Sequence, residues 1–171
     1  MMKSKAFFVI AALLITNLIY AQKSISTKTK QMITKNEVYE WLDAWNSHDM
    51  NKILDLFADS ALVYQPQNPE PLTKDKVAFF FSNLFKTYPD IHFETDGYII
   101  EGNEVASWEI VTGTMTGDFH DPATGKMVAP TGKSFKIPGA MRIIYDDTKK
   151  IASVRIYWDR LSFNQQLGLI K

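Results

Sequence analysis

Residues 74–90 read KDKVAFFFSNLFKTYPD, and residues 91–101 continue as IHFETDGYIIE. In the first segment the apolar side chains recur three or four positions apart, which is typical of one face of a helix. This stripe consists of Val77, Phe80, Phe81, Leu84 and Phe85. After Pro89-Asp90, apolar and polar residues alternate, which is typical of a half-buried strand. The chain therefore changes at this point from helical to extended structure.

The segment before residue 74 predicts two further helices. The first begins at Thr34, which has the capping-box spacing to Glu37. Its apolar stripe is Val38, Trp41, Leu42 and Trp45. Asp49 is a suitable N-cap for the second helix, whose apolar side chains are Ile53, Leu54, Leu56 and Phe57. Residues 61–64 are then predicted as a short strand, because prolines at 66, 69 and 71 stop it.

The C-terminal half predicts a run of strands. We expect them near 91–101, 103–117, 133–146 and 150–160, with hairpin turns at 101–103 and 146–149 and a long loop at 120–132. A last helix over 162–167 ends at Gly168, the position of a C-cap glycine. This order predicts an α+β fold: N-terminal helices pack on a strongly curved, mostly antiparallel sheet and form a cone with an internal pocket.

The first 21 residues resemble a secretory signal peptide. Lys3 and Lys5 precede an apolar run over 6–20, and Ala21 offers a small residue for cleavage. An uncleaved membrane anchor is the alternative, although the run is shorter than a typical span. We expect cleavage after Ala21, a flexible linker at 22–33 and one domain at 34–171. The mature protein would then be secreted or periplasmic in a bacterium, with no stable insertion in a membrane.

Composition narrows the classes of partner. The 171 residues carry no formal net charge, so nothing favours nucleic acid as a partner. The chain has no cysteine, which excludes disulfides and thiolate metal sites. Its three histidines lack the spacing of a metal motif. We therefore expect neither a metal nor a cofactor.

Asp159 is the first candidate for a catalytic group. It ends the aromatic strand Arg155-Ile156-Tyr157-Trp158-Asp159, and a carboxylate there is costly unless it is solvated, paired or used. A partner for a neighbouring arginine, or a cap for the last helix, is the structural alternative. His120, beside Asp121, is a second candidate as a proton shuttle at the mouth of a pocket, with an ordinary loop histidine as its alternative.

Several motifs in order resemble the SnoaL-like polyketide cyclases of the nuclear-transport-factor-like superfamily. They are Trp45-x-x-His48-Asp49, Leu56-Phe57-Ala58-Asp59, Tyr88-Pro89-Asp90, Pro130-Thr131-Gly132-Lys133 and Asp159 followed by Gln165-Gln166-Leu167-Gly168. The resemblance covers about 36–168. It implies three helices closing a curved sheet over a deep pocket, and a last-strand aspartate, here Asp159, as general acid and base. The position of the base in ketosteroid isomerases is here Gln65, which cannot take a proton.

The resemblance also implies a ligand pocket, for which the candidates are Trp41, Trp45, Tyr64, Phe81, Trp108 and Tyr157. We expect an exported domain, in a homodimer, that binds a small apolar carbonyl-containing molecule. The reaction would be cofactor-free acid/base catalysis of the aldol cyclase, isomerase or dehydratase type through Asp159. The alternatives are a non-catalytic binding module in the same cavity and a dimerisation module with a filled cone.

Overall fold

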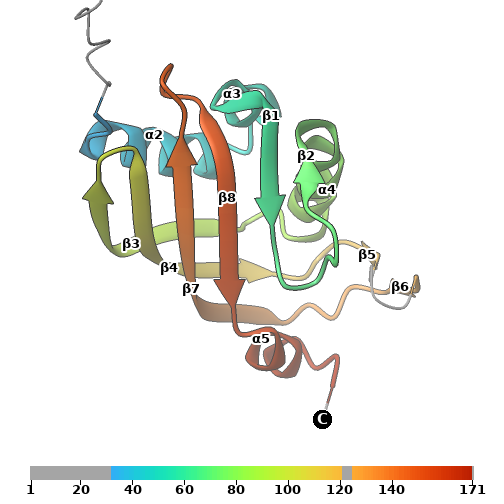
Figure 1. Ribbon diagram of the computed structural model, residues 1–171. Helices are drawn as coiled ribbons and strands as arrows, with labels where there is room; N and C mark the ends of the chain where they lie inside the picture. The colour runs from blue at the N-terminus through green and yellow to red at the C-terminus, as the bar shows by residue number, and fades with distance from the viewer. Residues whose placement is uncertain (1–31, 121–124, 171) are drawn as a thin grey trace, which may run out of the picture. The chain divides into compact units, whose positions relative to one another are not determined.

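The computed structural model describes residues 32–120 and 125–170 (Figure 1). The predicted signal peptide and the predicted linker up to residue 31 lie outside the described residues. Within the described ranges, no helix is both long and apolar enough to cross a membrane.

Helices cluster in the first half of the described chain and strands in the second. The helices are α2 (Lys35–Asn46), α3 (Met50–Asp55), α4 (Lys74–Thr87) and α5 (Arg160–Gln166). The strands are β1 (Phe57–Tyr64), β2 (Leu72–Thr73), β3 (His92–Glu101), β4 (Glu104–Thr114), β5 (Phe119–His120), β6 (Met127–Val128), β7 (Ser134–Tyr145) and β8 (Ile151–Trp158).

Six strands form the main sheet in the order β2-β1-β8-β7-β4-β3. All neighbours are antiparallel except β1 and β8, which are parallel. The long strands β4 and β7 bend along their length, so the sheet curls (Figure 1). A bulge between Thr95 and Gly97 adds to this curvature, and Gly97 adopts a φ of 154° there. The predicted α+β class with a curved, mostly antiparallel sheet is confirmed.

Two element predictions need correction. The second helix stops at Asp55, so Leu56 and Phe57 are not helical. Phe57 starts β1 instead, pairs with Ile151 and packs its ring 6.0 Å from that of Trp41. This tertiary pairing outweighs the helical spacing of the sequence. The predicted loop at 120–132 contains a second, two-stranded sheet of β5 and β6.

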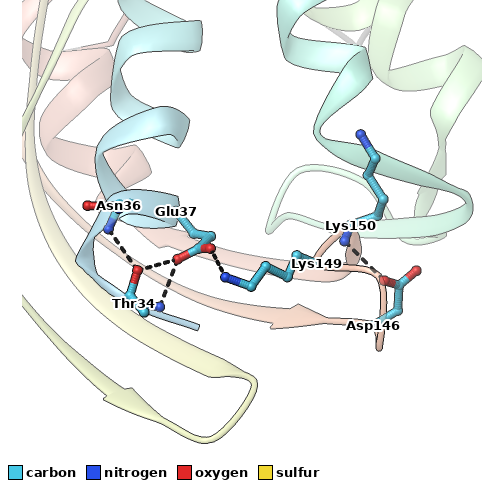
Figure 2. Close-up of polar contacts among 6 residues, drawn as sticks. All are labelled: Thr34, Asn36, Glu37, Asp146, Lys149 and Lys150. Carbon is cyan, nitrogen blue, oxygen red and sulfur yellow. Dashed lines mark hydrogen bonds and ion pairs between the residues drawn. The ribbon is translucent and has the colours of Figure 1, made fainter. Parts of the chain in front are cut away.

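The N-terminus of α2 is tied to the turn between β7 and β8 (Figure 2). The backbone N–H and the hydroxyl of Thr34 donate to Glu37 Oε2 at 2.8 and 2.7 Å, which confirms the predicted capping box. The ammonium of Lys149 donates to Glu37 Oε1. Burial raises the pKa of Glu37, but the hydrogen bonds from Lys149 and Thr34 outweigh it and lower the pKa to about 2.

Buried side chains form two clusters. The larger includes Trp41, Trp45 and Phe81, and joins α2–α4 to the sheet. The smaller centres on Tyr88 and Phe135, whose rings meet at 5.3 Å. Side chains of both clusters line one cavity, so the interior of the protein contains a cavity between two packed clusters.

Candidate active site

The cavity has a volume of about 340 Å³ and an apolar wall. Its lining comes from α2, α4 and α5, from strands β3, β4, β7 and β8 of the curved sheet, and from the β5–β6 pair. Aromatic rings supply much of the wall, among them Trp41, Trp45, Phe93, Phe135, Trp158 and Phe163. A concave apolar site of this size is typical of small-molecule binding.

Among the described residues, Glu109 is the one carboxylic acid that lines the cavity. It lies in the middle of β4, and only 3% of its surface is exposed. Ser107, two residues earlier on the same face of the strand, donates its hydroxyl to Glu109 Oε1 at 3.3 Å. Burial raises the pKa of Glu109 to about 7, and the bond from Ser107 offsets this only in part. The carboxyl can therefore both take and give a proton near neutral pH.

The sheet leaves free space beside this carboxyl. Glu109 pairs with Gly139 on β7, and Gly139 pairs with Trp158 on β8. Directly paired residues share a face of the sheet, so all three face the cavity that they line. Because Gly139 has no side chain, the neighbouring position is open. A Cβ there would come no closer than 3.5 Å to a neighbour, the carbonyl oxygen of Tyr157.

Four further residues of the lining carry a buried polar atom without a hydrogen-bond partner. These atoms are Trp45 Nε1, Tyr88 Oη, Gln65 Nε2 and Gln67 Oε1. Leaving such an atom unpaired costs about 1–3 kcal/mol. Buried polar atoms without a hydrogen-bond partner are rare in native proteins, so four of them around one cavity indicate a function for the site. An oxygen of a bound ligand would accept from Trp45 Nε1, Tyr88 Oη or Gln65 Nε2, whereas Gln67 Oε1 would need a donor on the ligand.

Asp159 caps α5. Its Oδ1 accepts from the backbone N–H of Ser162 at 3.0 Å, and its residue surface is exposed. It is not in the cavity wall, although its neighbours Trp158 and Arg160 are. The structure therefore gives Asp159 the capping role that the sequence left open as an alternative. Its catalytic role stays a prediction.

His120 is exposed on β5, opposite Met127 of β6. Its neighbour Phe119 lines the cavity, and His120 does not. Among the described residues, no three His, Asp or Glu side chains gather in a way that could hold a metal ion.

Three of the six predicted pocket aromatics, Trp41, Trp45 and Tyr157, border the cavity, but Tyr157 belongs to the outer face of β8 and is 54% exposed. Phe81 stands behind the wall, where its ring packs 4.4 Å from that of Trp45. Tyr64 stacks under the guanidinium of Arg155 at 4.3 Å. Trp108 is 44% exposed on the opposite face of β4, because it alternates with Ser107 and Glu109.

Glu109 is not among the site residues predicted from the sequence. The predicted pocket residue on this strand, Trp108, lies on the opposite face. A usable signal existed: Val105, Val111 and Met115 share the parity of Glu109, and Val105 and Met115 are almost fully buried. An acid at a position where the alternating residues of a strand are otherwise apolar is expected to be buried, and a buried acid is a candidate for a functional group.

Residues 36–167 match the family model described as SnoaL-like polyketide cyclase. The chain belongs to the SnoaL-like polyketide cyclase family. The resemblance seen in the sequence is thereby confirmed. Among curated protein sequences, none matches this SnoaL-like chain at a significant level.

Several solved structures share the fold of this SnoaL-like chain. AclR of Streptomyces galilaeus, provisionally described as a hydroxylase, is 21% identical with a TM-score of 0.67, over 80% of this chain and 81% of its own. IdmH of Streptomyces antibioticus, provisionally described as a polyketide cyclase, is 20% identical with a TM-score of 0.64, over 78% and 97%. A SnoaL-like protein of Jannaschia sp. CCS1 is 15% identical with a TM-score of 0.67, over 80% and 92%. At these identities the likeness shows the fold alone.

Proposed function

We propose that this SnoaL-like protein binds a small, largely apolar, carbonyl-containing molecule and catalyses proton transfer on it without a cofactor. One observation carries the proposal: Glu109 is a buried carboxyl with a pKa raised to about 7, in the wall of an otherwise apolar cavity. Burying an acid in this way costs stability, which is typical of functional sites.

The reaction would begin with Glu109 as a carboxylate. It takes a proton from the carbon next to the ligand's carbonyl, and the electron pair of the C–H bond moves to the carbonyl oxygen as an enolate. The enolate carbon then attacks a second carbonyl of the ligand, or the enolate is reprotonated at a different carbon. The protonated Glu109 returns the proton to the new oxygen or carbon. One group can serve both steps because its pKa lies near the working pH.

The unpaired donors of the wall would stabilise the developing negative charge. Trp45 Nε1 and Tyr88 Oη are buried, have no protein partner and belong to residues of the cavity wall. A hydrogen bond to a charged oxygen is stronger than one to a neutral carbonyl, so such donors favour the enolate over the substrate. Burial also raises the pKa of the Tyr88 hydroxyl, which keeps it a donor at neutral pH.

A direct test uses 2-tetralone, an apolar bicyclic ketone with exchangeable protons next to its carbonyl. Binding is measured by calorimetry, and exchange of those protons with D₂O by proton NMR. We expect the protein to accelerate this exchange. In Glu109→Gln the exchange rate should fall at least 100-fold, while the variant still binds the ketone. Asp159→Asn is the matched control, because it also turns an acid into its amide.

Three results would decide against this assignment. Loss of exchange in Asp159→Asn with full activity in Glu109→Gln would move the acid/base role to Asp159, as the sequence predicted. Binding without accelerated exchange would favour the non-catalytic binding module. Failure of 2-tetralone and of related apolar ketones to bind would contradict the ligand class. The cavity of about 340 Å³ already favours a ligand site over a filled, purely structural cone.

Export and dimer formation belong to the same proposal. Export is supported by the charged and apolar pattern of residues 1–21. A homodimer is supported by the outer face of the sheet, where Trp108 and Tyr157 are 44% and 54% exposed in one row through Ala140. N-terminal sequencing of the mature protein and sedimentation equilibrium test these two points.

A further inference from the structure

Gln65 and Gln67 form a pair of side-chain amides at one end of the cavity wall. Gln65 follows β1, and the turn closed by the Asn68 N–H to Gln65 carbonyl bond brings Gln67 back beside it. Gln67 Nε2 donates to Gln65 Oε1 at 2.6 Å. Gln65 is only 8% exposed and Gln67 is half-buried, with its Oε1 atom inaccessible to solvent.

One bond between the two amides leaves one donor and one acceptor unused. Gln65 Nε2 and Gln67 Oε1 are buried and have no partner. Turning both amides over would exchange the roles of the two residues but would again leave one nitrogen and one oxygen. The chemistry of the pair is therefore the same in either orientation: a neutral donor beside a neutral acceptor.

The pair lies at a distance from Glu109 that a ligand could span. By register, Gln65 continues the row of Ile156, Met141 and Ser107 across the sheet. Three strand spacings, roughly 14 Å along the curved sheet, separate Gln65 from Ser107. Glu109 lies two residues beyond Ser107 on the same face of β4 and accepts its hydrogen bond. The residues between the ends, Ile156 and Met141, are apolar and line the cavity. The apolar side chains of Ile156 and Met141 therefore lie between the amide pair and the end of the cavity that holds Glu109.

We infer that the Gln65–Gln67 pair selects ligands that carry an amide, as a primary carboxamide or a lactam, at the end remote from Glu109. The carbonyl oxygen of such an amide accepts from Gln65 Nε2, and its N–H donates to Gln67 Oε1, after a small rotation of the buried side chains. A ketone or ester offers no donor and leaves Gln67 Oε1 unpaired. A carboxylate would face that same oxygen without a proton, which is unfavourable.

This inference rests on the proposed use of the cavity for ligand binding, but it does not require catalysis by Glu109. The test compares probes with one carbon skeleton: naphthalene-2-carboxamide, its methyl ester counterpart, 2-acetylnaphthalene and 2-naphthoate. We expect the carboxamide to bind at least 10-fold more tightly than the other three, by calorimetry. Gln65→Met and Gln67→Met should each reduce that preference to within about 3-fold while changing affinity for the ester little.

Gln165→Met is the matched control, because Gln165 is exposed on α5 and lies outside the cavity wall. Side-chain ¹⁵N–¹H NMR gives a second readout in the unaltered protein: the Gln65 amide protons should shift on addition of the carboxamide and not of the ester. Equal affinity for carboxamide and ester, a preference for the 2-naphthoate carboxylate, or a preference that survives both Gln variants would overturn the inference. Accelerated exchange of 2-tetralone in the same preparation would show that such a failure leaves the proposed function standing.

Discussion

Glu109 lies directly opposite Gly139 in the register of β4 and β7, so the buried carboxyl has an empty position beside it. Both residues line the cavity. A side chain at 139 would occupy the space where we propose that a ligand approaches the acid. Access to the Glu109 carboxyl therefore depends on position 139 having no side chain.

Gly139→Val should block the cavity next to Glu109. A Cβ fits there, 3.5 Å from the Tyr157 carbonyl oxygen, and valine suits a strand, so we expect stability to change by no more than about 1–2 kcal/mol. The affinity for 2-tetralone should fall at least 10-fold, measured by calorimetry. Ala106→Val, on the exposed face of β4, is the control and should bind normally. Unchanged affinity in Gly139→Val would mean that ligands avoid this end of the cavity.

Glu109 should make the protein less stable as the pH rises. Its pKa is about 7 in the folded protein, against 4.5 for an ordinary glutamate, so between these values the folded state holds a proton that the unfolded state has lost. Stability therefore falls as pH increases from about 4.5 to 7. The full penalty, roughly 3 kcal/mol, applies above pH 7. Urea unfolding at pH 4, 6 and 8 measures this effect. The free energy of unfolding of Glu109→Gln, relative to that of the unaltered protein, should increase over this range. A pH-independent difference would mean that the carboxyl is not buried in solution.

Glu37 should have the opposite pH dependence. Its folded pKa of about 2 lies below the 4.5 of an ordinary glutamate, so its contribution to stability is present above pH 4.5 and is lost as the pH falls towards 2. We expect Glu37→Gln to cost about 1 kcal/mol at pH 7, since the bonds with Thr34 and Lys149 are charge-assisted but partly screened.

Urea unfolding of Glu37→Gln at pH 7 and pH 3 measures this effect, and Lys149→Met completes a double-mutant cycle for the pair drawn in Figure 2. The control is Glu40→Gln, which lies on the same helix and is exposed. A coupling energy of zero at pH 7 would show that the contact between Glu37 and Lys149 contributes nothing to the fold.

Two substitutions of Asp159 distinguish a role in capping α5 from a role in catalysis. Asp159→Ala should cost about 1 kcal/mol, because it removes the bond to the Ser162 N–H at the start of α5. Asp159→Asn keeps a capping oxygen and should be close to the unaltered protein in both melting temperature and exchange rate. A stable Asp159→Asn protein with a much reduced exchange rate would support the catalytic role predicted from the sequence.

The sequence alone determined the fold class, because the change of apolar period at Pro89-Asp90 and the caps at Thr34 and Asp49 are local signals. It also predicted Trp41 and Trp45 as pocket residues, and both line the cavity. It did not predict the parallel pairing of β1 with β8, because partners of distant strands are not encoded locally.

Only the tertiary structure decided which acid lies in the cavity wall. Asp159 and Glu109 are both acids on or beside strands, and a list of residues does not distinguish them. The curl of the sheet encloses Glu109 between β3 and β7, while the end of β8 leaves Asp159 at the surface as a cap. Burial raises the pKa of Glu109 to about 7, and burial depends on which elements fold over a residue rather than on its neighbours in sequence.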